Sequence, residues 1–404
     1  MRVSLAPKTH GLLFLKTPFM NNIRFFPLLL LLAACNPKVD KPPIQKATTV
    51  TTFIGTYTRK EGHVDGKGAG IYVFNQDSIS GYLDEILLEE GIRNPSFLIP
   101  SADGKYLYTV EEIGPDVDSV GHVVAYAWDG KSLKKINSQS SHAFAPCHLT
   151  TDSQGRYLFV ANYVGGTIAM LPIDANGGLN PASEVIKYNG NGPHSRQDAS
   201  HPHSVNLSPD ERYLYVPDLG TDRINIYQID YTNGKLTPAN PAFAAIQPGS
   251  GPRHFTFHPT QPFAYLINEL NNTITVMRWQ KETGKLDTLQ SAPTLPTDFK
   301  GENTTSDIHI TPDGQFLYGA NRGHNSLAGY KINTSDGTLT PIGHTSTQGE
   351  IPRNFAISPD GRFLYAANQN TDNVLIFSIE ADGKLQYRNE LKTPTPVCVQ
   401  FGKR

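Results

Sequence analysis

The sequence predicts an all-β fold built from repeated units of about 50 residues. The first observation is a recurring phrase in which an aromatic residue is followed by Leu or Ala and then by Tyr or Phe, often directly after Asp-Gly. Successive copies are 51, 56, 50, 53 and 47 residues apart. The six copies begin at Tyr106, Tyr157, Tyr213, Phe263, Phe316 and Phe363.

The second observation is a glycine closely followed by leucine, which marks a turn after a run of alternating residues such as 273–279. Strand-only repeats of this length are typical of propellers, in which four-stranded sheets surround a channel. Seven such turns therefore predict a seven-bladed β-propeller with four antiparallel strands per blade. The turns are Gly81/Leu83, Gly130/Leu133, Gly177/Leu179, Gly234/Leu236, Gly284/Leu286, Gly337/Leu339 and Gly383/Leu385.

The strands of one blade can be assigned directly from the alternation. They are expected at residues 253–258, 263–269, 273–280 and 285–289. Because there are seven turns but six aromatic phrases, one blade is expected to be shared by the two ends of the chain. Sharing a blade would remove the open edge between the first and last blades. Its strands are expected at residues 53–58, 70–74, 83–88 and 396–401.

The start of the chain resembles an export signal. A basic stretch after Met20 precedes a short apolar run and the sequence Leu32-Ala33-Ala34-Cys35. This pattern predicts a signal peptide over residues 1–34, with Met20 as the better start, and is similar to the bacterial lipoprotein box, in which the Cys is lipidated. The alternative is an ordinary signal peptide with an incidental Cys35. The apolar run is too short to span a membrane.

These features divide the chain into an exported anchor and one domain. Residues 35–50 are predicted to be a flexible, lipid-anchored tether, and residues 51–404 the propeller. The protein is thus expected to face the periplasm or the cell surface, attached to the membrane through Cys35, and to be a monomer. The net charge of −2 has mixed signs, which argues against a nucleic-acid partner. Cys147 and Cys398 fall on innermost strands two blades apart, so we expect free, buried thiols.

Stacking the repeats brings polar residues into register. A row is the set of residues at one fixed offset from the first aromatic of each phrase. Two rows fall where the second strand of each blade ends, and two fall where the innermost strand begins. Antiparallel pairing puts these strand ends at one edge of the sheet. All four rows are therefore expected to meet at one mouth of the channel. Counted from the first aromatic, the rows are +5 (Glu111, Asn162, Asp218, Asn268, Asn321, Asn368), +6 (Glu112, Tyr163, Leu219, Glu269, Arg322, Gln369), −10 (Ser96, Cys147, His203, Arg253, Ser306, Arg353) and −9 (Phe97, His148, Ser204, His254, Asp307, Asn354).

Two interpretations of these rows remain open. An Asn at a strand end often only caps a turn, which is the preferred interpretation for Asn162, Asn321 and Asn368. Charged residues are seldom buried unpaired, so the arginines and Glu269 must pair with each other or meet a charged ligand.

Five motifs stand out in this register. They are His201-Pro-His203-Ser, Gly251-Pro-Arg253-His254-Phe, Asn268-Glu269-Leu270, Ser306-Asp307-Ile308-His309 and Asn321-Arg322-Gly323-His324-Asn325-Ser326. These motifs resemble the lactonase family of seven-bladed propellers, which includes propeller-type 6-phosphogluconolactonases and fungal carboxy-cis,cis-muconate cyclases. The likeness covers residues 50–402. The resemblance implies that His203, Arg253, Glu269 and Arg322 are catalytic, by analogy with the His, Glu and two Arg of the cyclase branch.

The resemblance implies hydrolysis of a cyclic ester, with Glu269 or His203 as the base on water and Arg253 and Arg322 holding the developing charge. An exported enzyme favours an unphosphorylated sugar lactone or a carboxylated lactone over phosphogluconolactone. The residues expected to bind the substrate are His148, Asp218, His254, Asn268, His309 and Arg353.

No cofactor is expected. A metal is not expected either, because the histidines come from different blades and lack tight ligand spacing. The alternatives to a lactonase are a non-enzymatic propeller that binds a glycan or a protein and a lyase or isomerase of the muconate cyclase type.

Overall fold

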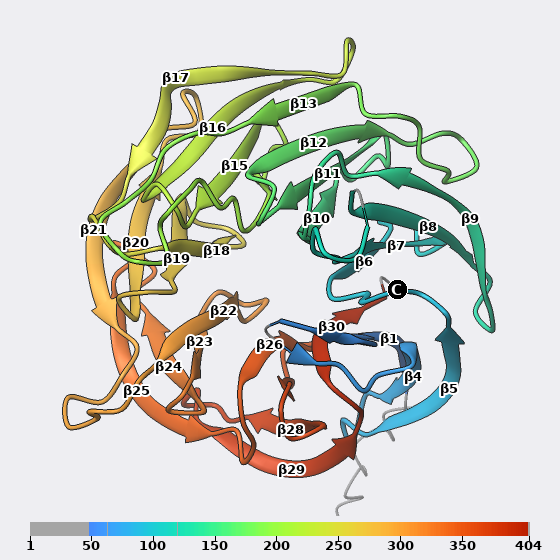
Figure 1. Ribbon diagram of the computed structural model, residues 1–404. Coiled ribbons are helices and arrows are strands. Elements are labelled where there is room, and N and C mark those ends of the chain that lie inside the picture. The colour runs from blue at the N-terminus through green and yellow to red at the C-terminus, as the bar shows by residue number, and fades with distance from the viewer. Residues whose placement is uncertain (1–47, 63, 119, 403–404) are drawn as a thin grey trace, which may run out of the picture. The chain divides into compact units, whose positions relative to one another are not determined.

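The computed structural model describes residues 48–62, 64–118 and 120–402, and all regular structure in these ranges is β (Figure 1). Seven four-stranded antiparallel sheets follow one another around a common axis, which confirms the predicted seven-bladed propeller. Within the described ranges there is no helix long and apolar enough to cross a bilayer. The predicted signal peptide and Cys35 lie outside the described residues.

Each blade is named here from its innermost to its outermost strand. Blade 1 is β30 (Pro396–Phe401), β1 (Thr49–Thr56), β4 (Gly70–Asp77) and β5 (Leu83–Glu90); blade 2 is β6 (Leu98–Pro100), β7 (Tyr106–Glu111), β8 (His122–Trp128) and β9 (Leu133–Ser140); blade 3 is β10 (Pro146–Thr151), β11 (Tyr157–Asn162), β12 (Thr167–Pro172) and β13 (Glu184–Lys187); blade 4 is β14 (Asn206–Leu207), β15 (Tyr213–Asp218), β16 (Arg223–Asp230) and β17 (Lys235–Ala245).

The remaining blades follow the same order. Blade 5 is β18 (Pro252–Phe257), β19 (Phe263–Asn268), β20 (Thr273–Trp279) and β21 (Leu286–Pro293); blade 6 is β22 (Thr304–Ile310), β23 (Phe316–Arg322), β24 (Ser326–Ile332) and β25 (Leu339–Ser346); blade 7 is β26 (Pro352–Ile357), β27 (Phe363–Asn368), β28 (Asn373–Ile379) and β29 (Leu385–Lys392). A separate two-stranded ribbon joins β2 (Lys60–Glu61) to β3 (Val64–Asp65).

The two ends of the chain close the ring in blade 1, as the sequence predicts. The last strand, β30, pairs with β1, and Val399 lies opposite Ile54. In Figure 1 the red C-terminal strand accordingly lies beside the blue N-terminal strand. The first strand begins at Thr49, slightly before the expected start of the propeller at residue 51.

The two repeated sequence features contact each other between neighbouring blades. The second aromatic of the phrase lies on the second strand and, where it is tyrosine, its hydroxyl donates to the carbonyl of the turn glycine in the next blade. The pairs are Tyr108 with Gly177 (3.1 Å), Tyr215 with Gly284 (2.6 Å), Tyr265 with Gly337 (2.9 Å), Tyr318 with Gly383 (2.7 Å) and Tyr365 with Gly81 (2.6 Å).

The turn glycine is required for two reasons. Gly81 and Gly337 have φ values of 78° and 80°, a region that other residues seldom adopt. A Cβ at either position would also lie only 2.6 Å from the ring of Phe363 or Phe263, the first aromatic of the neighbouring phrase. The aromatic phrase and the glycine turn are thus two halves of one contact, which explains why they recur together.

The apolar core lies between the blades. The buried hydrophobic residues form clusters, each of which combines side chains from adjacent sheets. Burial of this apolar surface is the main force that holds the sheets together. Cys147 and Cys398 are buried and free, as expected.

Replacing Tyr365 with Phe should lower the free energy of unfolding by about 1–2 kcal/mol, because the Gly81 carbonyl loses its donor across the ring closure. Chemical denaturation of the purified propeller measures this change. The control is Tyr387→Phe, which removes the hydroxyl of an exposed tyrosine and should leave stability unchanged. Equal stability of the Tyr365→Phe variant and the parent would show that this bond does not stabilise the closed ring.

Candidate active site

β-bulges at the start of the innermost strands place the functional side chains. In β10, β18 and β26 the pairing with the second strand shifts by one residue, so Cys147, Arg253 and Arg353 are each an extra residue. A bulge redirects the side chain that it carries. All three bulged residues are in the −10 row, which explains why this row departs from the alternation of the strand.

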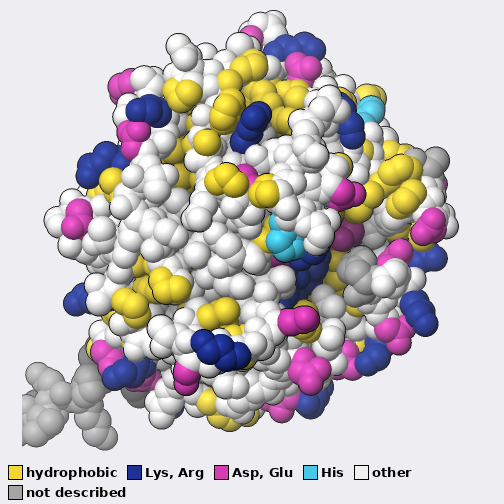
Figure 2. Space-filling model, turned by 60° about the vertical axis from the view of Figure 1, so that its left-hand side comes forward, with side chains coloured by type: hydrophobic (Ala, Val, Ile, Leu, Met, Phe, Trp, Pro, Cys, Tyr) yellow, Lys and Arg dark blue, Asp and Glu magenta, His cyan; other side chains and the backbone are white. Residues whose placement is uncertain are grey.

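A cavity of about 570 Å³ opens where the innermost strands begin, and it is called here the arginine cavity. Its lining includes five residues of the +6 row and four of the −10 row. Figure 2 shows a hollow of this kind, with basic side chains at its floor and acidic and histidine side chains beside it. The lining residues of these two rows are Glu112, Tyr163, Glu269, Arg322 and Gln369, and Cys147, His203, Arg253 and Arg353.

Glu269 lies at the centre of the arginine cavity and contacts three guanidinium groups. Its Oε2 atom is 2.7 Å from Arg253 Nη1 and 3.0 Å from Arg322 Nη2, and its Oε1 atom is 2.6 Å from Arg196 Nη2. The side chain of Glu269 is only 2% exposed. Because three cations surround one anion, this cluster has a surplus of positive charge, while the carboxylates of Glu61, Glu112 and Asp116 lie elsewhere in the cavity lining.

Arg253 and His203 form the second part of the site. Arg253 Nη1 donates to His203 Nε2, and Arg253 Nε donates to the carbonyl of Ser306 at 2.6 Å. His203 Nδ1 faces Cys147 Sγ at 3.8 Å. Burial raises the pKa of the Cys147 thiol, so this cysteine remains protonated and is a poor nucleophile.

A second acidic group anchors Arg353. The Nη2 atom of Arg353 lies 3.9 Å from Oε1 of Glu112, and the guanidinium of Arg353 is 5.3 Å from the ring centre of Tyr57. Tyr57 donates to Glu112 Oε2 at 2.9 Å. Arg353 therefore adds a fourth guanidinium to the lining of the arginine cavity.

The charge states at neutral pH follow from these contacts. Burial alone would raise the pKa of Glu269, but Arg322, Arg253 and Arg196 outweigh it and hold the pKa well below the usual range. Burial lowers the pKa of His203 well below its usual value, and the charge of Arg253 lowers it further. The site therefore holds an ionised carboxylate beside a neutral imidazole.

The structure places the residues expected to bind substrate in three different environments. Arg353 lines the arginine cavity. Asp218 and Asn268 do not: Asp218 accepts from the backbone amides of His201 and Gly220, and Asn268 donates to Thr273 and Thr275. His148, His254 and His309 line another cavity, described below.

The expectation that all four rows meet at one mouth of the channel is therefore wrong for the +5 row and the −9 row. Successive side chains on a strand point in opposite directions, so the +5 row is buried where the +6 row faces the cavity. Asn162, Asn321 and Asn368 each donate across the turn that follows, to Thr167, Ser326 and Asn373, in agreement with the capping interpretation. Each also donates to a backbone carbonyl of the preceding blade. The −9 row follows the bulged residue and faces the opposite end of the axis.

The sequence reasoning missed Arg196. This residue belongs to the segment between β13 and β14, which lies outside the repeat register, and its side chain is 45% exposed. The buried Gln197 fixes the segment, since its Nε2 donates to the carbonyl of Leu219 at 2.8 Å. The only available signal was the run of polar residues just before His201-Pro-His203.

Comparison with known proteins identifies the family. Residues 51–401 match the family model described as "Lactonase, 7-bladed beta-propeller". The chain belongs to the lactonase family of seven-bladed β-propellers. The resemblance noted from the motifs is thus confirmed, and the chain is placed among lactonases.

Individual members of the lactonase family are similar over most of their length. The chain is 34% identical to a 6-phosphogluconolactonase of Bacillus subtilis, over 86% of this chain and 97% of that protein. It is 36% identical to a 6-phosphogluconolactonase of Formosa agariphila, over 83% and 94%. The structure of a periplasmic gluconolactonase of Pseudomonas aeruginosa matches with a TM-score of 0.82 and 32% identity, over 88% and 99%.

Replacing Arg253 with Met should raise the pKa of His203, because one of the charges that lowers it is removed while burial remains. A titration of ¹⁵N-histidine-labelled protein followed by NMR measures this pKa. Arg196→Met is the matched control, since Arg196 contacts Glu269 and should leave the His203 titration unchanged. An unchanged His203 pKa in Arg253→Met would contradict the electrostatic description of the site.

Proposed function

We propose that the arginine cavity hydrolyses a lactone by adding water to the ring carbonyl. The observation that carries this proposal is the convergence of three guanidinium groups on the buried Glu269. Attack on an ester carbonyl develops negative charge on its oxygen, and fixed donors in a site shielded from water stabilise that charge strongly. The surplus positive charge beside Glu269 suits this role.

Arg253 and Arg322 are the proposed oxyanion donors. Their side chains are 3% and 11% exposed, so both groups are largely desolvated. Each is also held by a backbone carbonyl, Arg253 by Ser306 and Arg322 by Thr305 at 2.8 Å. A guanidinium fixed in this way can meet a developing oxyanion without reorganising during the reaction.

His203 is the proposed base on water, and Glu269 positions the guanidiniums. The pKa values of Glu269 and His203 are both lowered, so both groups are unprotonated at neutral pH. Three guanidiniums occupy the two oxygens of Glu269, whereas among the described residues His203 Nε2 has a contact with Arg253 alone. When a substrate oxygen accepts the hydrogen bond of Arg253 in place of His203, Nε2 of His203 is free to accept a proton from water. The new carbon–oxygen bond then forms, the ring carbon–oxygen bond breaks, and His203 returns the proton to the leaving ring oxygen.

The proposed substrate is a sugar lactone. The protein should hydrolyse it faster when the lactone bears a negatively charged substituent. Arg196 and Arg353 extend the cationic lining beyond the two oxyanion donors. Guanidinium groups bind carboxylates and phosphates in a bidentate manner, so they favour such substituents. The relatives named gluconolactonase and 6-phosphogluconolactonase support this class.

The decisive experiment measures hydrolysis of glucono-1,5-lactone, its 6-phosphate and a carboxylated lactone by the purified propeller. His203→Asn should lower kcat by about 100-fold or more with little change in KM, because it removes the base. Glu269→Gln should mainly raise KM, because the guanidiniums lose their anchor.

Two results would contradict this assignment. The first is a Glu269→Gln variant with a strongly reduced kcat and an unchanged KM, together with a His203→Asn variant whose kinetics match the parent. That result would make Glu269 the base. No hydrolysis of any lactone by the folded parent protein would overturn the proposed function and favour a binding propeller. Far-ultraviolet circular dichroism confirms that each variant is folded.

The pH profile tests the base separately. A base must be unprotonated to act, and the lowered pKa of His203 keeps it unprotonated down to acidic pH. In the parent enzyme, kcat/KM should therefore stay level as the pH falls from 8 through 6.5, and it should decrease only below that range. A decrease centred above pH 6.5 would contradict a base with a lowered pKa.

We also propose that the protein is exported and lipid-anchored. The proposal rests on Leu32-Ala33-Ala34-Cys35 and its apolar run, and the periplasmic relative is consistent with it. In a bacterial host, Cys35→Ser should abolish incorporation of labelled fatty acid and release the protein from the membrane fraction. Labelling that persists in Cys35→Ser would contradict the anchor at Cys35, and Cys398→Ser is the control that should remain labelled.

A further inference from the structure

A second cavity lies on the opposite side of the propeller, and it is called here the histidine cavity. It has a volume of about 440 Å³ and is lined by the later halves of innermost strands, whereas the arginine cavity is lined by their beginnings. His148, His254, His309 and Asp307 are among its lining residues. Its size lies within the range of small-molecule sites.

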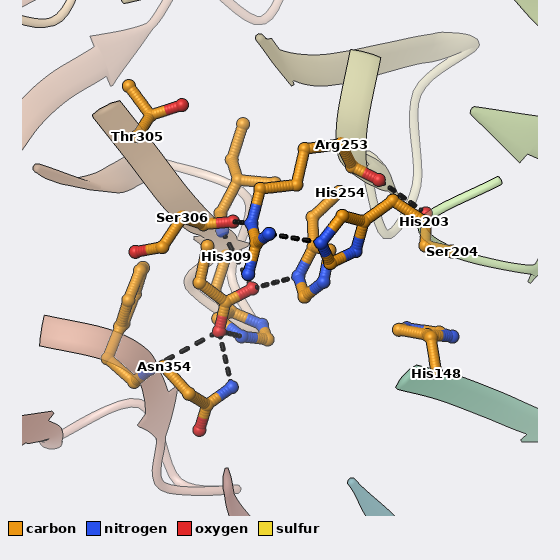
Figure 3. A network of polar contacts seen from close by, with 12 residues as sticks. His148, His203, Ser204, Arg253, His254, Thr305, Ser306, His309 and Asn354 are labelled. Atoms are coloured by element: carbon orange, nitrogen blue, oxygen red, sulfur yellow. Dashed lines mark hydrogen bonds and ion pairs between the residues drawn. The ribbon is translucent and has the colours of Figure 1, made fainter. Parts of the chain in front are cut away.

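Asp307 organises the wall of the histidine cavity. It accepts from His254 Nδ1 at 2.7 Å, from His309 Nε2 at 3.0 Å and from Asn354 Nδ2 at 2.5 Å. Figure 3 shows this network beside Arg253 and His203. Since a carboxylate only accepts, His254 must carry a proton on Nδ1. Neutral His254 therefore presents the lone pair of Nε2.

His148 presents the opposite hydrogen-bonding character. The backbone amide of Val205 donates to its Nδ1 at 3.3 Å, so neutral His148 carries its proton on Nε2. The ring centres of His148 and His254 are 5.3 Å apart, and the ring centre of Phe97 lies 4.2 Å from that of His148. Burial lowers the pKa of both histidines, which keeps them neutral at pH 7.

No partner within the described residues satisfies Nε2 of His148 or of His254. An acceptor on the buried His254 and a donor on the half-buried His148 are thus held near each other at the wall of a cavity. A hydroxyl group can donate to the first and accept from the second.

The charged groups of this lining are the Asp307–His309 pair and the carboxylate of Glu211. Burial disfavours the charged form of His309, but Asp307 raises its pKa, so the two make an ion pair. No Lys or Arg is present among the described residues that line the histidine cavity, in contrast to the four arginines of the other cavity. An anionic ligand therefore finds no counter-charge here.

We propose that the histidine cavity binds an uncharged, hydroxyl-bearing small molecule, such as a polyol or a monosaccharide. One hydroxyl bridges His254 Nε2 and His148 Nε2–H. Thr150, Thr256 and Asn206 supply further polar contacts, and Phe257 supplies an apolar surface for the carbon–hydrogen face of the ligand. Small-molecule sites commonly combine aromatic surface with a few placed polar groups in this way.

The test is a titration of ¹⁵N-histidine-labelled propeller with glycerol, sorbitol and D-glucose, followed by NMR. At least one of these uncharged probes should shift the His148 and His254 resonances saturably. The shifts should persist in Glu269→Gln, because Glu269 does not line the histidine cavity. They should also persist in His142→Asn, which changes an exposed histidine at a φ of 67° that Asn tolerates.

Two variants block the proposed site. His254→Phe removes the acceptor, and Thr256→Phe fills the cavity without removing a partner of Asp307, so the second variant remains informative if the first fails to fold. Both should abolish the shifts. The proposal is overturned if no uncharged probe shifts either histidine, if the shifts disappear in Glu269→Gln, or if they survive in folded Thr256→Phe.

Discussion

A single buried carboxylate, that of Glu269, holds three guanidinium groups in fixed positions, and the proposed chemistry depends on this contact. Taking charges out of water costs several kcal/mol per ion, and even good geometry often only offsets that cost. A cluster with three cations and one anion is therefore a poor device for stability. Its surplus charge is better explained by a ligand or a transition state that supplies the missing negative charge.

The propeller makes this cluster possible because it joins distant parts of the chain. Arg253 lies on β18 and Glu269 directly follows β19, both in blade 5, and Arg322 ends β23 in blade 6. The tyrosine–glycine bonds between blades, including the one that closes the ring at Gly81, fix the spacing of these sheets. Local bulges then turn individual side chains toward the arginine cavity.

Much of the fold could be predicted because its signals are periodic. The glycine turn recurs in all seven blades and the aromatic phrase in six of them, and the structure shows that they contact each other. The sequence placed His203, Arg253, Glu269 and Arg322 at one site because all four belong to two rows of the repeat. Arg196 could not be found in this way, since its segment follows no repeat.

The division of the polar rows between two cavities could not be predicted either. A row position gives depth along a strand, but a one-residue bulge decides which end of the axis a side chain faces. His254 directly follows the bulged Arg253, yet it lines the opposite cavity.

The most direct test of the central claim is a crystal structure of the propeller with D-gluconate, the hydroxy-acid product of gluconolactone hydrolysis. The account predicts that the product carboxylate lies within hydrogen-bonding distance of Arg253 and Arg322 and next to His203. A product bound elsewhere, or a Glu269 carboxylate that points away from these guanidinium groups, would contradict it.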